Sequence, residues 1–145
     1  MPIYFCTAAE GRLTSVQKAE IAEAITAIYH EETGAPRYLV RVIFNDIAPG
    51  NHYVAGRLGS ADEIWVRCDT RSGKTESVKN KMIRRILTDV AKVSGADQDA
   101  VSVLLNETPS SNFTEFGRIA PASGEEEAWF SSLPDSLQQR LKALS

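Results

Sequence analysis

Apolar residues recur at helical spacing in two segments of the chain, and each segment lies between a start signal and a stop signal. Thr14 followed by Gln17 is a capping-box pattern, in which side chains satisfy the free amides at the start of a helix. Gly34 supplies the stop. The second segment has Thr75 at its start and Gly95 at its end, with the same spacing. The apolar stripes that predict the two helices are Ile21, Ala24, Ile25, Ile28 and Tyr29, and Val78, Met82, Ile86, Val90 and Val93.

Four shorter apolar segments predict strands. Ile3-Tyr4-Phe5 precedes the first helix, and Ile64-Trp65-Val66 precedes the second. The runs around 38–46 and 100–107, which follow the helices, are almost continuously apolar, as is typical of parallel strands covered on both faces. Each helix therefore lies between two strands, and such a unit makes a right-handed βαβ crossover.

The two units are copies of one pattern. Residues 1–46 and 62–107 match without a gap at a constant offset of 61, and 47–61 connect them. The predicted fold class is α/β, with two fused βαβ units that form a four-stranded sheet carrying both helices on one face. The other face then stays bare, and small domains usually bury such a face by symmetric association, so we expect an oligomer.

The chain is expected to form one domain over 1–145. The segment 108–145 has no counterpart in the repeat: Pro109 to Gly117 has the composition of a loop, and a short helix carrying Leu137, Leu141 and Leu144 follows. We expect this tail to pack across a neighbouring subunit. A short hairpin is expected near Tyr53-Val54 in the connection.

Composition excludes several classes of function. The formal net charge is −3 and 43% of residues are hydrophobic, which is ordinary for a globular domain. The chain has no basic cluster of the kind that binds nucleic acid or a membrane surface. It also has no apolar run long enough for a membrane span, and its start lacks the features of a signal peptide. We expect a cytoplasmic protein. Cys6 and Cys68 do not have the spacing of metal ligands, so we expect them to be reduced, structural thiols. His30 and His52 likewise do not have the spacing of a metal-binding motif.

The copies differ at the residue before their first strand, which is Pro2 in one and Glu63 in the other. Methionine before a residue as small as proline is normally removed during synthesis, which would leave Pro2 with a free secondary amine. An α-amino group has a pKa near 7.7–8.0, and burial or nearby cations lower it, so this amine is a candidate general base at neutral pH. A retained Met1 would turn the amine into an amide and abolish this chemistry.

A Pro-Ile-Tyr start on a duplicated βαβ unit resembles the tautomerase superfamily. Three longer motifs, along essentially the whole chain, resemble its cis-3-chloroacrylic acid dehalogenase group. The resemblance implies a homotrimer that needs no metal or organic cofactor, with an N-terminal proline beside two arginines, a histidine, a tyrosine and a glutamate. The motifs are Thr70-Arg71-Ser72-Gly73-Lys74-Thr75-Glu76, Ser111-Asn112-Phe113-Thr114-Glu115-Phe116-Gly117-Arg118 and Gly124-Glu125-Glu126-Glu127-Ala128-Trp129-Phe130.

The resemblance assigns six positions, of which three are kept and three depart. The proline corresponds to Pro2, the first arginine to Arg71 and the glutamate to Glu115. In the other three positions Lys74 replaces the second arginine, Tyr29 the histidine and Leu104 the tyrosine. Pro2 and Glu115 are thus the candidate catalytic residues, and Arg71, Lys74, Tyr29 and Leu104 the candidate substrate contacts.

These departures bear on the reaction. In the dehalogenases the tyrosine and glutamate are held to activate a water, and Leu104 forms no hydrogen bond. Proton transfer needs only a base and an anchored anion, which favours an enol–keto tautomerase of small 2-oxo or 2-hydroxy-alkenoate carboxylates, such as phenylenolpyruvate. Two alternatives stay open: a hydratase or cis-3-haloacrylate dehalogenase with Glu115 activating water, and a non-catalytic trimeric binding protein.

Overall fold

The computed structural model describes residues 2–145, so the prediction that Met1 is removed lies outside the described residues. The two βαβ units supply the main elements. The first consists of β1 (Ile3–Ala9), α1 (Ser15–Thr33), the 3₁₀ turn η1 (Arg37–Leu39) and β2 (Arg41–Ile47). The second consists of β5 (Ile64–Arg71), α2 (Glu76–Ser94), the 3₁₀ turn η2 (Gln98–Ala100) and β6 (Val101–Thr108), and the connection contains β3 (Tyr53–Val54) and β4 (Arg57–Leu58).

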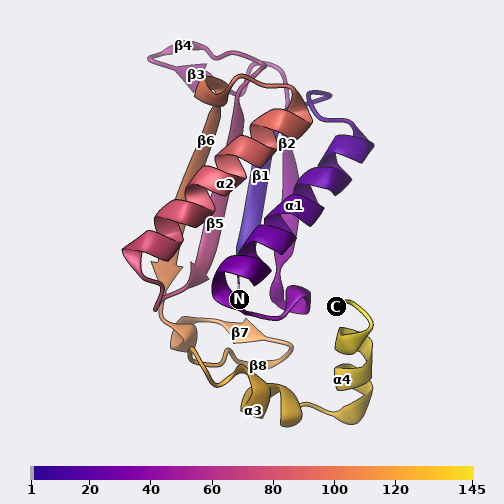
Figure 1. Ribbon diagram of the computed structural model, residues 1–145. Helices are drawn as coiled ribbons and strands as arrows, with labels where there is room; N and C mark the ends of the chain where they lie inside the picture. Colours follow the sequence, from indigo (N-terminus) through magenta and orange to yellow (C-terminus); the bar gives the residue numbers. More distant parts are fainter. Residues whose placement is uncertain (1) are drawn as a thin grey trace.

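The sheet has the strand order β2-β1-β5-β6, and both long helices lie on one of its faces (Figure 1). The strands within each unit are parallel, whereas the central strands β1 and β5 are antiparallel, with Ile3 opposite Asp69 and Ala8 opposite Ile64. The predicted fold class, including the repeat and the one-sided helices, is confirmed. The hairpin expected near Tyr53-Val54 is present as β3 and β4.

The helix ends follow the signals in the sequence. The Thr14 hydroxyl accepts a hydrogen bond from the Gln17 amide at 3.1 Å, and the Gln17 side chain accepts one from the Thr14 amide at 3.0 Å, which completes the capping box. Gly34 and Gly95 end their helices in the left-handed conformation, with φ of 70° and 71°. A residue without a Cβ adopts this conformation at little cost.

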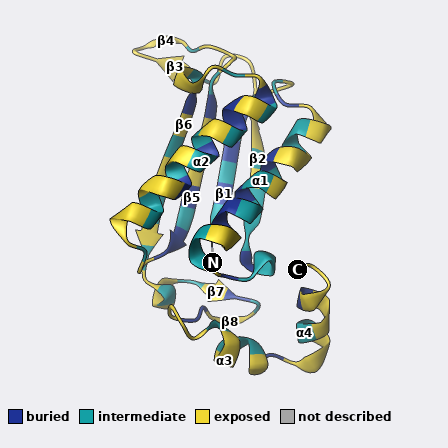
Figure 2. Ribbon diagram, in the orientation of Figure 1, coloured by how far each residue is buried: buried dark blue, intermediate teal, exposed yellow. Residues whose placement is uncertain are grey.

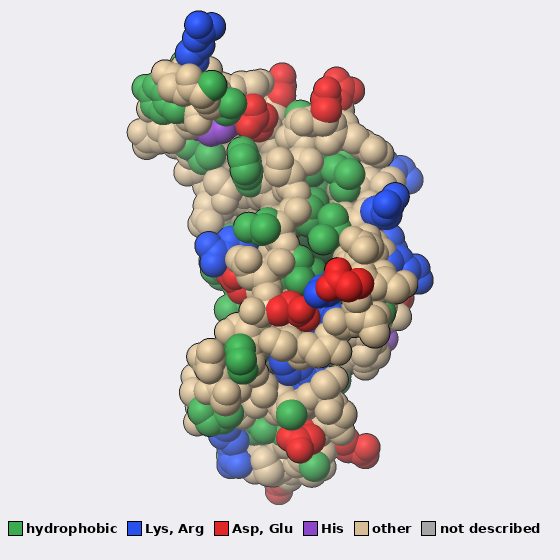
Figure 3. Space-filling view, turned by 90° about the vertical axis from the view of Figure 1, so that its left-hand side faces the viewer, with side chains coloured by type: hydrophobic (Ala, Val, Ile, Leu, Met, Phe, Trp, Pro, Cys, Tyr) green, Lys and Arg blue, Asp and Glu red, His purple; other side chains and the backbone are tan. Residues whose placement is uncertain are grey.

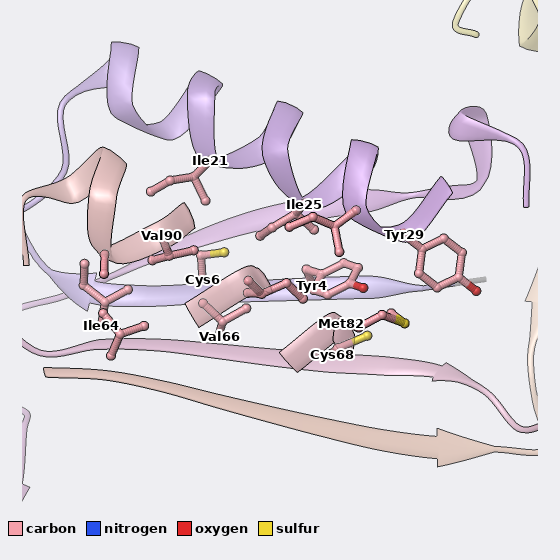
Figure 4. Packing of buried hydrophobic residues seen from close by; sticks show 14 of the residues in the cluster. Tyr4, Cys6, Ile21, Ile25, Tyr29, Ile64, Val66, Cys68, Met82 and Val90 are labelled. Carbon is pink, nitrogen blue, oxygen red and sulfur yellow. The ribbon is translucent and has the colours of Figure 1, made fainter. Parts of the chain in front are cut away.

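The core fills the space between the helices and the sheet (Figure 4). Alternate residues of β1 and β5 point into it, including Tyr4, Cys6 and Cys68, which are all buried. Both cysteines are free thiols, and burial raises their pKa to about 12, so they stay protonated at neutral pH.

Both long helices lie on the face of the sheet that is toward the viewer in Figure 2, which leaves the opposite face uncovered in the described part of the protomer. It exposes the large apolar side chains of Ile43, Trp65 and Leu104. Figure 3 shows this face in profile on its left side, where the β3–β4 hairpin projects beyond the sheet at the top. These apolar side chains share the face with the Arg67–Asp69 ion pair, and an uncovered face of this kind is the feature from which self-association was expected.

The C-terminal segment closes one end of the sheet (Figure 1). It contains the 3₁₀ turn η3 (Ser110–Asn112), β7 (Thr114–Glu115), β8 (Arg118–Ile119), α3 (Glu126–Ser131) and α4 (Asp135–Lys142). The expectation of a plain loop over 109–117 is wrong, because this segment forms a turn and half of a tight hairpin whose strands are too short to show an alternating pattern. The expected short helix is present as α4, which carries Leu137 and Leu141 but ends before Leu144, whereas α3 was not predicted.

We expect the core between helix and sheet to provide most of the stability. Met82 is fully buried, so Met82→Ala removes packed atoms and should lower the free energy of unfolding by about 2–5 kcal/mol. Val16→Ala, on an exposed position of α1, is the matched control and should change it by less than about 0.5 kcal/mol. Urea denaturation followed by circular dichroism at one protein concentration measures both. Equal losses for the two variants would contradict this description of the core.

Candidate active site

Pro2 is buried where the two central strands meet the C-terminal segment. Its carbonyl oxygen accepts a hydrogen bond from the Arg41 amide at 3.1 Å, which ties it to the start of β2. The antiparallel register pairs Ile3 with Asp69, so its continuation places Pro2 opposite Thr70 at the end of β5. The sheet thereby brings the start of the chain next to the Thr70-to-Lys74 motif.

Arg41 and Glu115 form an ion pair on the β2 side of Pro2. Glu115 is only 5% exposed, and the Arg41 guanidinium also lies 5.2 Å from the centre of the Phe116 ring. Phe116 and Gly117 both have positive φ, 48° and 81°, as a tight hairpin turn of the type I′ kind requires. This turn lets β7 carry the Glu115 carboxylate inward, where Arg41 compensates its charge.

Arg71 lies at the end of β5 and is almost fully engaged by the C-terminal segment. Its guanidinium donates to the carbonyl oxygens of Pro121 at 2.7 Å and Ala122 at 2.9 Å, and it also donates to the Glu126 carboxylate. Burial opposes ionisation of Glu126, but hydrogen bonds from Arg71 and from the Gly124 amide outweigh it and lower the pKa of this carboxyl. Arg71 therefore already holds a carboxylate that belongs to the chain itself.

Lys74 has a different environment. Its ammonium group donates to the Thr70 hydroxyl at 3.0 Å and to the Arg71 carbonyl at 2.6 Å, and it lies 5.5 Å from the centre of the Tyr29 ring. Burial lowers the pKa of Lys74. Among residues 2–145, no carboxylate lies within ion-pairing distance of Lys74 Nζ.

Tyr29 connects the first helix to this group. Its ring is buried in the core at an edge-to-face angle to Tyr4, and its hydroxyl lies 3.3 Å from the Thr70 hydroxyl. Burial raises the pKa of Tyr29, so the phenol stays protonated and can donate a hydrogen bond. Tyr29 is thus both a core residue and a polar contact of Thr70.

The structure brings some of the sequence-predicted residues together and separates others. Tyr29, Arg71 and Lys74 line one cavity of about 200 Å³. Glu115 lies on the other side of the Pro2 strand with Arg41. Leu104 is 55% exposed on the uncovered face of the sheet, where it lines a separate hollow with Trp65. Within one subunit, Leu104 is therefore not part of this cavity.

Sequence reasoning assigned no role to three residues that the geometry places here: Thr70, Arg41 and Glu126. A signal for Arg41 was present in the repeat, since the equivalent position of the second copy is Ser102. Thr70 and Glu126 belong to motifs that the resemblance highlighted, but their contacts depend on the path of the C-terminal segment.

Neither a metal site nor a membrane span is found among the described residues. Residues 2–145 contain no group of three or more His, Cys, Asp or Glu side chains positioned to hold a metal ion. In the same part of the chain, no helix has the length and apolar character to cross a membrane.

Known proteins confirm the resemblance. Residues 1–132 match the Tautomerase_3 family model, described as "Putative oxalocrotonate tautomerase enzyme". No curated protein matches the chain. The crystal structure of N1, a member of the cis-3-chloroacrylic acid dehalogenase family, is 37% identical, with a TM-score of 0.93, and the match covers 97% of this chain and 99% of N1.

More distant structures share the fold. A fused 4-OT, described as a wild-type symmetric trimer, is 24% identical, with a TM-score of 0.73 over 81% of this chain and 94% of its own. A point mutant of RhCC from Rhodococcus jostii is 23% identical, with a TM-score of 0.69 over 98% of this chain and 89% of its own. The family match over 1–132 and the 37% identity to N1 identify the chain as a member of the tautomerase superfamily, homologous to its cis-3-chloroacrylic acid dehalogenase group.

Proposed function

We propose that the protein is a cofactor-independent enol–keto tautomerase of small 2-oxo or 2-hydroxy-alkenoate carboxylates, with the amine of Pro2, freed by removal of Met1, as general base. One observation carries this proposal: the buried Pro2 precedes the strand that pairs with Arg41 of β2, and it lies opposite Thr70 of β5, whose hydroxyl accepts a hydrogen bond from Lys74. A neutral amine among cations and an anion-binding wall are the two requirements of the reaction.

In this mechanism Pro2 moves one proton. Its neutral amine takes the proton from the enol hydroxyl at C2, and the oxygen electrons form the C2 carbonyl as the double bond shifts. The resulting prolyl ammonium then returns a proton to C3. Burial and the neighbouring cations favour the neutral amine at pH 7, and the same cations stabilise the negative charge that develops on the oxygen.

Lys74 and Arg71 would hold the substrate carboxylate in different ways. Lys74 has no carboxylate partner among the described residues, so its charge is available to an anion. Arg71 offers a planar fork suited to a carboxylate, but Glu126 occupies it, so the substrate must replace Glu126 there. Tyr29 contributes its ring and its protonated hydroxyl to the same wall, and Glu115, held by Arg41, orients the substrate or a water.

We further propose a homotrimer in which the uncovered sheet faces meet. The exposed apolar side chains on that face support self-association, and a fused 4-OT with this fold is described as a trimer. Leu104 lies on that face, away from the cavity of its own subunit, so association provides its route to the site of a neighbouring copy.

Replacing the base should abolish the activity. Pro2→Ala leaves a primary amine with altered basicity and position, and we expect kcat/KM for phenylenolpyruvate to fall by about 10²–10⁴-fold. Ultraviolet absorbance follows the decay of the enol, and mass spectrometry verifies that Met1 is absent. Pro49→Ala, in the connecting loop, is the matched control and should retain full activity. A Pro2→Ala variant as active as the parent protein would refute the role of Pro2.

Removing the Glu126 carboxylate, which occupies Arg71, should tighten substrate binding. Glu126→Gln removes the negative charge that pairs with Arg71, and a substrate carboxylate then replaces only a neutral amide. We therefore expect KM to fall severalfold with kcat changed less. Steady-state kinetics with phenylenolpyruvate measures both constants. A rise in KM would instead mean that Glu126 serves to hold Arg71 in position.

Charging the uncovered sheet face should disrupt assembly. Trp65→Glu places a carboxylate in the apolar surface, and we expect size-exclusion chromatography with light scattering to show monomers in place of trimers. Val16→Glu, an equally apolar-to-charged change on an exposed position of α1, should leave the trimer intact. Trimers in both variants would place the interface elsewhere.

A further inference from the structure

Either protonation state of Lys74 can make the two hydrogen bonds that hold its Nζ atom. A lysine ammonium has three N–H donors, and the neutral amine has two. Lys74 Nζ has two oxygen acceptors among the described residues, the Thr70 hydroxyl at 3.0 Å and the Arg71 carbonyl at 2.6 Å. A neutral amine can therefore keep both hydrogen bonds and still have a lone pair free for the cavity that Lys74 lines.

Burial, rather than the surrounding charge, favours the neutral form: it lowers the pKa of Lys74, while Glu107 favours the ammonium and Arg71 opposes it. Arg71 is the neighbouring cation and lines the same cavity. The two nearest acidic side chains are already neutralised by other cations, since Glu107 pairs with Lys79, and Glu32 pairs with Lys81 and Arg85. Desolvation beside another cation is a known way to turn a lysine into a nucleophile, and burial lowers the pKa of Lys74 accordingly.

The cavity also contains a route for protons. Tyr29, protonated because burial raises the pKa of its phenol, lies 3.3 Å from the Thr70 hydroxyl, and this hydroxyl accepts from Lys74. A phenol, a hydroxyl and an amine are thus connected in series: Tyr29 and Lys74 line the cavity, and the buried Thr70 hydroxyl connects them. About 200 Å³ accommodates a pyruvate-sized acid.

We propose that Lys74 forms a reversible imine with the carbonyl carbon of small 2-oxo carboxylates, as a second, covalent activity of this cavity. Only the choice of 2-oxo acids as the carbonyl class rests on the proposed tautomerase function. The geometry of Lys74, Thr70, Tyr29 and Arg71 carries the rest.

The reaction balances without a cofactor. The Lys74 nitrogen lone pair forms a bond to C2 while the carbonyl π electrons move to oxygen. The first of the two nitrogen protons passes to that oxygen through the Thr70 and Tyr29 hydroxyls, which gives a neutral carbinolamine. The carbinolamine then loses its hydroxyl with a second proton as water, and the nitrogen electrons form the C=N bond. One carbonyl and one amine give one imine and one water, and Arg71 attracts the carboxylate throughout.

Reductive trapping tests the proposal. The full-length protein is incubated with pyruvate and sodium cyanoborohydride, which reduces an imine to a stable secondary amine, and the adduct is located by peptide mass spectrometry. We expect one adduct on Lys74, formed faster as the pH rises toward the pKa of the amine. Lys74→Arg should abolish this adduct, whereas Lys79→Arg, in the helix α2 that follows Lys74, should retain it.

Pro2→Ala separates this proposal from the tautomerase. If both hold, this variant loses tautomerisation but keeps the adduct on Lys74. An adduct on the Pro2 amine alone, labelling spread over surface lysines, or no labelling would overturn the imine proposal, whatever the outcome of the tautomerase assay. Tautomerase activity that survives in Pro2→Ala, together with an adduct on Lys74, would refute the role of Pro2 and leave the imine proposal standing.

Discussion

The antiparallel pairing of β1 with β5 is the constraint on which the site depends. Two βαβ units could be joined in other ways, but this pairing places the start of β1 against the end of β5. Pro2 therefore lies beside Thr70, although 68 residues separate them in the sequence. Both copies of the repeat form the same βαβ unit, but Pro2 of the first copy meets Thr70 of the second at only one end of the sheet.

Charge compensation organises the rest of the site. Arg41 neutralises the buried Glu115, and Glu126 neutralises the buried Arg71, as buried charges require. Lys74 is held by neutral oxygens instead. In the proposed functions this difference gives the two cations of the cavity wall distinct roles: a substrate carboxylate would reach Arg71 only by displacing Glu126, whereas Lys74 would bind an anion or, when neutral, react.

Much of the fold could be predicted because its signals are local. The Thr14 capping box and the glycine stops fix both helices, and α1 runs from Ser15 to Thr33 as the pattern indicates. The strand expected from residue 38 begins at Arg41, because Pro36 is followed by a 3₁₀ turn. The C-terminal hairpin escaped prediction because two-residue strands carry no periodicity.

The site was less predictable, since its contacts join distant parts of the chain. Arg41 and Glu115 are 74 positions apart in the sequence, and no local sequence pattern predicts that they pair. Arg71, Lys74 and Tyr29 were all assigned through the resemblance, and the structure brings them together around one cavity. Leu104 shows the limit of position-by-position transfer: the strand places it on the uncovered face, and only an assembly could bring it to a site.

The central claim is that Pro2 is a neutral amine at physiological pH, and its titration tests this most directly. Protein labelled with ¹⁵N-proline, with Met1 verified as absent, would be titrated by NMR while the Pro2 nitrogen resonance is followed. Burial and the neighbouring cations predict a pKa below the ordinary 7.7–8.0 of an α-amino group. A pKa above that range would make Pro2 an acid at neutral pH and contradict the account.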